Sequence, residues 1–539
     1  MTEYERWLKQ ENLDERLRAE LVAIAGNEAE IQDRFYRELT FGTGGLRGIL
    51  GAGTNRMNVY TVGRATFGLA SYLLKTDGSK QVVIAYDSRH FSHEFAVRAA
   101  KILSSFGIKV SLFGEIMPTP VLSYAVRTLH ADAGIVITAS HNPKEYNGYK
   151  VYNAHGCQIT DGAAAEILIE IEKADYFTPY TPDSNKIEIL DGKILEDFLG
   201  AIVPFGVSQE GLHGLKVVYT PLHGTGNVPV RTMLERMGAQ VIVVKEQEEP
   251  DGDFTTCPYP NPEERAALSL ALEYAAREDA DLVLATDPDA DRVGVAVPDK
   301  KGGFRFLNGN ETGVLLLSYM LSERAKAGTL KKAPTVIKTI VTTDMVYPIA
   351  AEYGARVKEV LTGFKYIGEE MDKTANFLLG MEESYGYLIG THVRDKDAVS
   401  AAMLIAQMCA HYRAENKTLV DVLEELFRKY GYYVTDLVTT TYRGEAGKAE
   451  MDGLLEKARR LHELYFEGEA MRFTDFSEGV DGLPKSNVLR YCNDSVRVVL
   501  RPSGTEPKLK IYYQARGGTL KQAQEILERL KAFVLQMLS

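Results

Sequence analysis

The sequence has few features of a disulfide-rich, zinc-binding or membrane-spanning protein. Its 539 residues include four cysteines, Cys157, Cys257, Cys409 and Cys492, which are far apart and form no CxxC or CxxH pair. This spacing favours neither a disulfide framework nor a zinc site. No apolar run reaches the length that spans a bilayer, and the charged N-terminus lacks the apolar core of a signal peptide. These absences predict a soluble, cytoplasmic protein with no membrane partner.

An excess of basic residues is also lacking. The chain has 62 Lys and Arg against 74 Asp and Glu, a formal net charge of −12. Because nucleic-acid binding requires a basic stripe, we expect no nucleic-acid partner. A small phosphorylated ligand is still compatible, since a site can be locally basic on an acidic protein. The length predicts roughly three or four domains.

Short apolar runs alternate with helical patterns through most of the chain. The first runs, at 82–86, 109–113 and 133–137, are separated by helical patterns at 93–107 and 119–129. This alternation indicates βαβ units and a mostly parallel sheet. Further predicted strands lie at 215–219, 241–244, 281–284, 335–341, 356–361 and 377–379, with helices at 64–74, 311–328 and, as one long stretch, 396–430.

The last hundred residues have a different pattern, with strands at 432–443, 488–492, 496–501 and 508–514 and helices at 445–462 and 519–538. Residues 1–40 read as helical. We therefore predict an α/β protein with three serial α/β domains of mixed, mostly parallel sheets, followed by a C-terminal α+β domain, around a central cleft. The predicted domains are 1–208, 209–304, 305–430 and 431–539.

A serine follows the run at 133–137, in the segment Thr-Ala-Ser-His-Asn-Pro at 138–143. Ser140 thus lies where loops at the carboxyl ends of parallel strands bind ligands. The alternative is a plain turn in which Ser140 and Asn142 cap local backbone groups. A serine nucleophile requires a base, and side chains of neighbours on extended backbone diverge, so His141 is a poor choice for that base.

Three aspartates, Asp287, Asp289 and Asp291, follow the strand predicted at 281–284. In an extended loop, residues two apart project to the same side, so the carboxylates can converge. They would repel one another unless a cation lay between them, and oxygen-only ligation suits Mg²⁺. An EF-hand is excluded, because Arg292 and Pro298 stand where Gly and Glu are required. A solvated acidic turn is the alternative, but the apolar flanks favour a metal site.

Two other loops could recognise a sugar phosphate. Residues two apart on an extended chain share a face, so Glu382 and Ser384 lie on the same side. They place a hydrogen-bond acceptor beside a donor, as adjacent sugar hydroxyls require. A helix-capping segment is the alternative there. At 501–507, Arg-Pro-Ser-Gly-Thr-Glu-Pro offers a guanidinium, two hydroxyls and an approachable glycine amide, a good phosphate cradle unless it is only a β-turn.

A glycine-rich segment at 41–48 is neither a Walker loop nor a dinucleotide fingerprint. It lacks the Lys-Ser/Thr of the first and does not follow a strand as the second does. Arg47, within it, is a candidate anion contact.

Together these loops resemble the α-D-phosphohexomutase superfamily, the phosphoglucomutases and phosphomannomutases. The segments TASHNP, DPDADR, EES and RPSGTEP occur in that family's order, and the resemblance covers essentially the whole chain. The segments Gly-Met-Glu-Glu-Ser-Tyr-Gly-Tyr and 257–263 look most similar to the long phosphoglucomutase branch that includes phosphopentomutases.

The resemblance implies a role for each matched residue. Ser140 would be the phosphoserine, and one of its phosphate oxygens would join Asp287, Asp289 and Asp291 in holding one Mg²⁺ per chain. Lys150 would be the candidate general base, and His141 and Arg47 would complete the catalytic set. The implied substrate contacts are Arg292, Thr362, Gly363, Glu382, Ser384, Lys396, Arg501, Ser503, Gly504 and Thr505.

The implied reaction interconverts glucose 1-phosphate and glucose 6-phosphate through the phosphoserine and a glucose 1,6-bisphosphate intermediate, which also serves as activator. Alternatives are a phosphomannomutase, a phosphopentomutase or a sugar-bisphosphate synthase on the same site. The expected partner is a small-molecule sugar phosphate, and the expected assembly a monomer or dimer. Some relatives carry a histidine soon after the sugar-loop serine. Here Tyr385, Gly386 and Tyr387 follow, which leaves the general acid unassigned.

Overall fold

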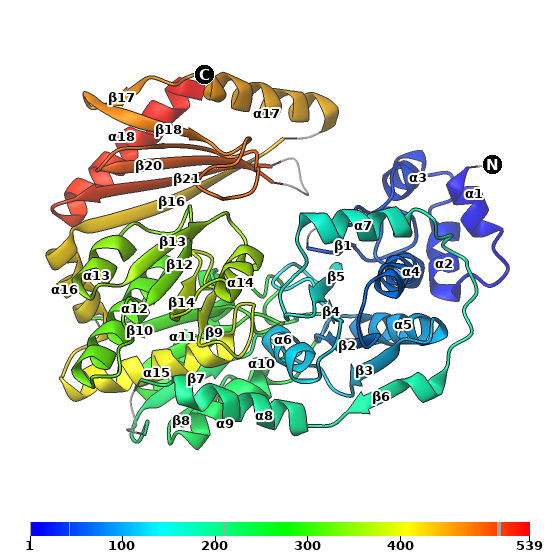
Figure 1. Cartoon of the computed structure of the whole chain (residues 1–539), viewed down its shortest axis with the longest axis horizontal. Coiled ribbons are helices and arrows are strands. Elements are labelled where there is room, and N and C mark those ends of the chain that lie inside the picture. Colours follow the sequence, from blue (N-terminus) through cyan, green and yellow to red (C-terminus); the bar gives the residue numbers. More distant parts are fainter. Residues whose placement is uncertain are drawn as a thin grey trace.

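The computed structural model describes residues 2–42, 44–207, 211–300, 302–442, 444–503 and 508–538. Three α/β sheets, each with parallel and antiparallel pairs, are followed by an antiparallel sheet at the C-terminus. The predicted fold class is confirmed. Figure 1 shows the first unit (blue to cyan) beside the second and third (green to yellow), with the C-terminal unit (orange to red) above the third.

The first unit is a six-stranded sheet with helices on both faces. Alternate residues of its central strands face opposite cores: Val82 and Ile84 pack with α4 and α5, while Val83 and Ala85 pack with α6 and α8. The sheet order is β1 (Leu46–Ile49), β5 (Tyr146–Asn153), β4 (Ala133–Ile137), β2 (Gln81–Tyr86), β3 (Lys109–Phe113) and β6 (Ile187–Leu190), and the helices are α4 (Val59–Lys75), α5 (Ser92–Ser105), α6 (Thr119–Thr128), α7 (Asp161–Ile171) and α8 (Lys193–Ile202).

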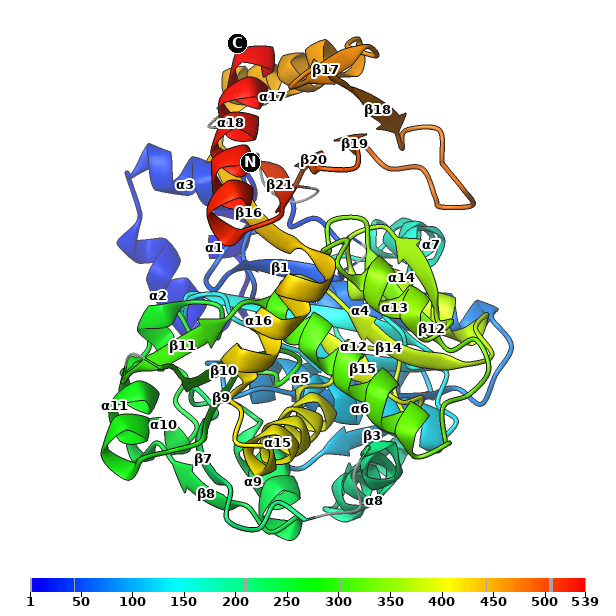
Figure 2. The same cartoon turned by 90° about the vertical axis from the view of Figure 1, so that its left-hand side faces the viewer.

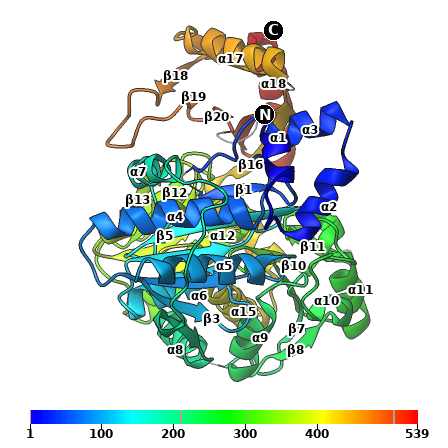
Figure 3. The ribbon, with the colours of Figure 1, turned by 90° about the vertical axis from the view of Figure 1, so that its right-hand side faces the viewer.

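Three short helices precede this sheet, in the region predicted as helical. They gather at one end of α4 (Figure 3). Trp7 is fully buried there, with the rings of Phe35, Tyr60, Tyr176 and Phe177 around it. The helices are α1 (Glu3–Leu8), α2 (Glu15–Ala23) and α3 (Glu28–Phe35).

The second unit is a five-stranded sheet whose central strand β9 leads directly into the aspartate loop. The chain returns from that loop along β10, antiparallel to β9. The sheet order is β11 (Phe304–Leu307), β10 (Val293–Pro298), β9 (Leu282–Thr286), β7 (Lys216–Thr220) and β8 (Gln240–Val243), and the helices are α9 (Asn227–Arg236), α10 (Lys245–Glu248) and α11 (Ser269–Glu278).

The third unit is a four-stranded sheet. The stretch predicted as one helical region, 396–430, is two helices, because Thr418 and Asp421 form a capping box that starts the second. The sheet order is β13 (Arg356–Val360), β12 (Thr335–Thr339), β14 (Phe377–Met381) and β15 (Tyr387–Ile389), and the helices are α12 (Gly309–Lys326), α13 (Val346–Glu352), α14 (Phe364–Asp372), α15 (Ala398–Ala414) and α16 (Leu419–Tyr430).

The C-terminal sheet is antiparallel and carries two helices against one of its faces. Figure 2 shows this unit above the third, with the N-terminal helices (blue) at the left of the view. The sheet order is β16 (Tyr432–Thr441), β21 (Lys508–Gly517), β20 (Val496–Pro502), β19 (Leu489–Cys492), β18 (Glu469–Asp475) and β17 (Leu464–Phe466), and the helices are α17 (Gly444–Arg459) and α18 (Leu520–Leu538).

The sequence pattern identified the buried parallel strands but missed several antiparallel ones. β5 has the sequence Tyr-Asn-Gly-Tyr-Lys-Val-Tyr-Asn, in which polar residues hide the strand although Asn147 through Tyr152 are buried. Its buried polar groups bond within the protein: Asn147 donates to the carbonyl of His90, and the hydroxyl of Tyr149 accepts from Thr66. Across the described residues, every helix is too short or too polar to serve as a membrane span.

Candidate active site

Ser140 lies just beyond the carboxyl end of β4, and its side chain is buried. Its backbone is left-handed (φ 53°), and its hydroxyl donates to Asp287 Oδ2 at 2.6 Å. His141 Nδ1 lies 3.3 Å from the same Oγ. The expectation that these two neighbours diverge was wrong, because it assumed extended backbone at Ser140. The left-handed turn brings both side chains to one side.

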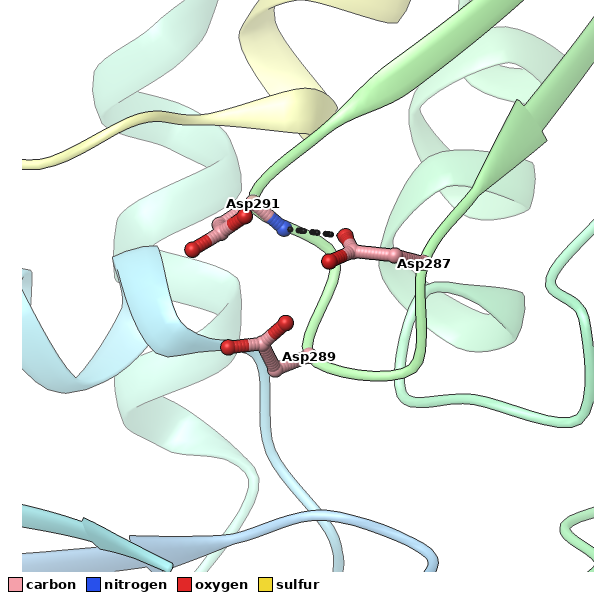
Figure 4. A group of neighbouring side chains, drawn as sticks. All are labelled: Asp287, Asp289 and Asp291. Carbon is pink, nitrogen blue, oxygen red and sulfur yellow. Dashed lines mark hydrogen bonds between the residues drawn. The ribbon is translucent and has the colours of Figure 1, made fainter. Parts of the chain in front are cut away.

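The three aspartates meet as the sequence predicted. Ligand oxygens of Asp287, Asp289 and Asp291 lie within 4.8 Å of one another, and all three residues are buried (Figure 4). The loop is a tight turn rather than an extended segment, with Ala290 left-handed (φ 49°). The amides of Asp291 and Arg292 donate to Asp287 Oδ1 at 3.1 and 3.0 Å. The carboxylates therefore converge because the loop winds around Asp287.

The oxygens of this aspartate cluster fit a divalent cation. Within the described part of the chain, Asp289 Oδ1 and Asp291 Oδ1 are buried and accept no hydrogen bond. Burial, together with the charges of Asp289 and Asp291, raises the pKa of Asp287 well above its usual value. Buried carboxylate oxygens without donors, in an all-oxygen set, match the ligand preference of a hard cation.

Two lysines from different units flank the aspartates. Lys150, in the middle of β5, lies 2.7 Å from Asp289 and 3.6 Å from Asp291. Lys396 lies 3.1 Å from Asp291 and 3.2 Å from Asp395. Burial alone would lower the pKa of each lysine, but the neighbouring carboxylates outweigh it and raise the pKa of both. Both ammonium groups are therefore charged in this arrangement.

The first unit also holds the aspartate loop through the start of α6. Thr119 donates from its amide to the carbonyl of Asp289 at 2.9 Å and from its hydroxyl to Asp289 Oδ2 at 3.0 Å. Burial alone would raise the pKa of Asp289, but Lys150 outweighs it and the pKa is lowered. Thr119 was not predicted, because nothing in its local sequence marks a long-range contact.

Arg292 connects the aspartate loop to the sugar loop. Its guanidinium pairs with Glu263 at 2.5 Å, and its backbone forms a β-bridge with Gly386. Glu263 was missed as a site residue, although the segment that contains it had been singled out.

The imidazole of His141 is neutral. Burial, and then the positive charges of Arg292 and Arg47, lower the pKa of His141 well below its usual value.

The sugar loop brings Glu382 against the segment before α14. The amide of Gly363 donates to Glu382 Oε1 at 2.9 Å, and the neighbouring Thr362 has a buried hydroxyl. Burial raises the pKa of Glu382 to about 7, even though the Lys396 charge opposes the shift. Glu383 points elsewhere, toward the hydroxyls of Thr339 and Thr342. Ser384, partly exposed, sits in the turn that follows.

The predicted phosphate loop is described in part. Arg501 lies opposite Lys510 in the ladder between β20 and β21 and bonds to Tyr512. Its charge also contributes to the environment of Lys365 on α14, so it faces the third unit. The amide of Ser503 donates to the carbonyl of Lys508 at 2.7 Å, and Arg47 donates to Asn142 Oδ1 at 3.4 Å. The predicted contacts Gly504 and Thr505 lie outside the described residues.

Comparison with known protein families accounts for most of the chain. Models of phosphoglucomutase/phosphomannomutase α/β/α domains I, II and III match residues 38–177, 196–302 and 308–430, and the model of the C-terminal domain matches 445–532. The chain belongs to the phosphoglucomutase/phosphomannomutase family. The predicted family is thereby confirmed, and the protein is an enzyme of the phosphoglucomutase type, an intramolecular phosphotransferase.

Individual members of the phosphoglucomutase/phosphomannomutase family match nearly end to end. A phosphoglucomutase of Staphylococcus haemolyticus (strain JCSC1435) is 37% identical over 513 residues, 91% of this chain and 93% of that protein. One of Staphylococcus aureus (strain MSSA476) is 34% identical over 539 residues, 94% of each. In structure, a putative phosphomannomutase from Thermus thermophilus superposes with a TM-score of 0.70 at 24% identity, over 93% of this chain and 99% of that one. This last likeness concerns the fold alone.

Proposed function

We propose that this chain interconverts glucose 1-phosphate and glucose 6-phosphate through phosphorylated Ser140 and a glucose 1,6-bisphosphate intermediate. The supporting observation is the 2.6 Å contact between the Ser140 hydroxyl and a buried aspartate cluster that two lysines and an arginine surround. The matched relatives carry the name phosphoglucomutase, which favours glucose over mannose or pentose phosphates.

In the proposed cycle the P–O bond to Ser140 breaks as a bond forms between phosphorus and the free hydroxyl of the sugar monophosphate. The sugar hydroxyl gives up its proton and the freed Ser140 oxygen takes one up, so Ser140 again carries a hydroxyl. The bisphosphate then returns its other phosphoryl group to that hydroxyl, and the sugar oxygen that loses this group takes up the proton. Such transfers depend mainly on positioning and on neutralising charge. One set of contacts must accept both orientations of the bisphosphate, so contacts to hydroxyls common to both orientations are favoured.

Asp287, Asp289 and Asp291 would hold a Mg²⁺ ion. When bound, it would supply charge neutralisation for the phosphoryl oxygens. Arg292 is already oriented toward the same region by Glu263. The arginine would balance phosphate charge that the aspartates alone would repel.

Lys150 is the side chain we assign to proton transfer. Its ammonium group is held charged between Asp289 and Asp291, so in this state it can donate a proton to a leaving oxygen. The general-base role requires it to lose a proton first. His141, neutral and 3.3 Å from Ser140 Oγ, is the other side chain placed to exchange a proton with that oxygen.

Recognition of the sugar falls to the third unit and the C-terminal unit. Glu382 can accept from sugar hydroxyls, with Thr362, Gly363, Ser384 and Lys396 near it. Arg501 and Ser503, continued by Gly504 and Thr505, would anchor the phosphate that is not transferred.

A coupled assay tests the proposal directly. Turnover of glucose 1-phosphate to glucose 6-phosphate is expected, with stimulation by a trace of glucose 1,6-bisphosphate. Parallel assays on mannose 1-phosphate and ribose 1-phosphate determine the sugar preference. Net release of the bisphosphate in place of glucose 6-phosphate would instead identify a bisphosphate synthase.

A further inference from the structure

One buried arginine binds the backbone of the whole serine loop. The Arg89 side chain is completely inaccessible to solvent and lies in the turn after β2. Its Nη1 donates to the carbonyls of Pro143 (2.9 Å) and Tyr146 (3.2 Å), and its Nη2 donates to those of Ser140 and Asn142, both at 2.5 Å. Four carbonyls of the segment 140–146 therefore converge on a single guanidinium.

Arg89 is itself held in place by two neighbours, Asp87 and Phe254. Its Nε lies 3.3 Å from Asp87 Oδ2, and its guanidinium lies 4.9 Å above the ring of Phe254. Asp87 Oδ1 accepts from the Arg89 amide and from the hydroxyl of Ser92. The β2 turn, anchored on the sheet by the bond from the Asp87 amide to Ile137, is thus a fixed support for the guanidinium.

The serine loop has a conformation that requires such support. Ser140 is left-handed (φ 53°), which costs a non-glycine residue free energy that the surroundings must offset. This same conformation directs the hydroxyl at Asp287 (2.6 Å) and places it beside His141. A buried loop carbonyl without a donor would also cost free energy, and Arg89 supplies donors for four of them.

We propose that Arg89 is a positioning residue for the phosphoryl transfer. It keeps Ser140 in the left-handed turn from which the hydroxyl faces the aspartate cluster. It acts through the loop backbone and not by contact with the reacting atoms. This inference rests on the proposed function, since a displaced nucleophile matters only if Ser140 carries the phosphoryl group. A displacement of about 1 Å is enough to lower a rate about 100-fold.

The test compares Arg89→Met, Arg89→Lys and Arg98→Met. Arg98 is the control, a partly buried arginine of the same unit whose guanidinium lies over Tyr180. For Arg89→Met we expect kcat to fall about 100-fold while the KM for glucose 1-phosphate stays within about threefold. Arg89→Lys keeps the charge but not the planar fork, so it should restore only part of the rate. Arg98→Met should keep the wild-type kcat.

A second readout does not require turnover. Hydrogen exchange of the amides in 138–148, followed by mass spectrometry, should accelerate in Arg89→Met and Arg89→Lys but not in Arg98→Met. Equal exchange and equal kcat in Arg89→Lys and wild type would overturn the inference, and so would a rise in KM with unchanged kcat. If wild type itself fails to convert glucose 1-phosphate, the proposed function fails, while the exchange data still decide whether Arg89 orders the loop.

Discussion

The aspartate cluster beside Ser140 and the ion network between the third unit and the C-terminal sheet are both buried groups of carboxylates and cations. In the network, Lys338 on β12 is fully buried and lies 2.8 Å from Glu359 and 3.3 Å from Asp344. Arg497 on β20 binds both acids, and Arg490 on β19 binds Glu359 at 2.9 Å. Gln514 donates to the remaining oxygen of Asp344, so all four carboxylate oxygens are bound.

What remains without a partner differs between the two groups. Among the described residues, the network leaves two N–H donors, Nε of Arg490 and Nε of Arg497, without an acceptor. The active-site cluster leaves carboxylate oxygens of Asp289 and Asp291 without a donor. The network is closed by the protein's own cations and holds two units together. The cluster, in contrast, keeps acceptors open for a cation that the chain does not supply.

Removing the nucleophile should separate chemistry from binding and gives the largest expected effect. Ser140→Ala should lower kcat by about 10⁴-fold or more, because it removes the hydroxyl that contacts Asp287 and would carry the phosphoryl group. The dissociation constant of glucose 6-phosphate, measured by calorimetry, should change little, since other loops bind the sugar and phosphate. Ser105→Ala in α5 is the control and should keep wild-type turnover. Retained mutase activity in Ser140→Ala would remove Ser140 from the mechanism.

Removing one acid from the closed network should cost stability rather than chemistry. Glu359→Gln leaves Lys338 and Arg497 short of negative charge in a buried place, and we expect the free energy of unfolding to fall by about 3–5 kcal/mol. Glu188→Gln, which breaks the exposed pair with Lys109, should change it by less than about 0.5 kcal/mol. Denaturant titrations measure the free energy of unfolding of both variants. Equally small losses in the two variants would mean that the network is not closed.

The pH dependence of the network follows from the pKa of Glu359. Burial alone would raise that pKa, but Lys338 and Arg497 outweigh it and lower the pKa well below the usual value of 4.5. A carboxyl group with a lowered folded pKa stabilises the fold above its unfolded pKa. The stabilisation should therefore be complete above about pH 4.5 and decline as the pH falls below it. The Glu359→Gln variant should lack this contribution, so its free energy of unfolding should fall less than that of wild type as the pH drops below about 4.5.

Removing one acid from the open aspartate cluster should stabilise the protein, the opposite of the effect expected in the closed network. Asp287→Asn relieves repulsion among three buried carboxylates, so the metal-free protein should gain roughly 1–3 kcal/mol. At the same time the stabilisation by added Mg²⁺ should be largely lost. Calorimetric melting in EDTA and in Mg²⁺ measures both effects, with the exposed Asp197→Asn as control. A metal-free Asp287→Asn protein less stable than wild type would contradict the idea of an open acidic cluster.

The smallest effect concerns the sugar loop. Because burial raises the pKa of Glu382 to about 7, its carboxylate is mostly ionised at pH 8 and mostly protonated at pH 6. If the ionised form accepts from the sugar, the KM for glucose 1-phosphate should rise about tenfold from pH 8 to pH 6. Glu382→Gln should remove this rise but keep any dependence due to the substrate's own phosphate. Parallel KM profiles for the two proteins would exclude the assignment.

The raised pKa of Glu382 also determines how this residue affects the stability of the fold at different pH values. Its folded pKa is raised, so its contribution is most favourable below the unfolded value of 4.5 and is lost as the pH rises through about 7. Glu382→Gln should therefore be more stable than wild type at pH 8, by at most about 3 kcal/mol. At pH 4 the two proteins should differ little, and unfolding curves at both values measure the difference.

Much of the fold could be predicted because buried parallel strands are continuous apolar runs. The strands predicted at 109–113 and 133–137 are β3 and β4 to the residue. Several strands in which polar residues interrupt the apolar run, such as β5, were not predicted. β5 carries Lys150 and Asn147 into a buried, polar region, so its pattern is not that of a strand packed on both faces. The division of the chain at 208, 304 and 430 stays a prediction.

The sequence by itself determined which chemical groups are present and where each lies relative to a strand end. Three aspartates at spacing two and a serine after an apolar run are local patterns, and local patterns are encoded in consecutive residues. Only the tertiary structure decided that Thr119 would hold Asp289, that Glu263 would orient Arg292 and that Arg89 would bind four carbonyls of the serine loop. These pairs join residues 29 to 170 positions apart. The first contact joins two units and the other two join distant segments of one unit, so all three depend on the tertiary fold, which no local periodicity records.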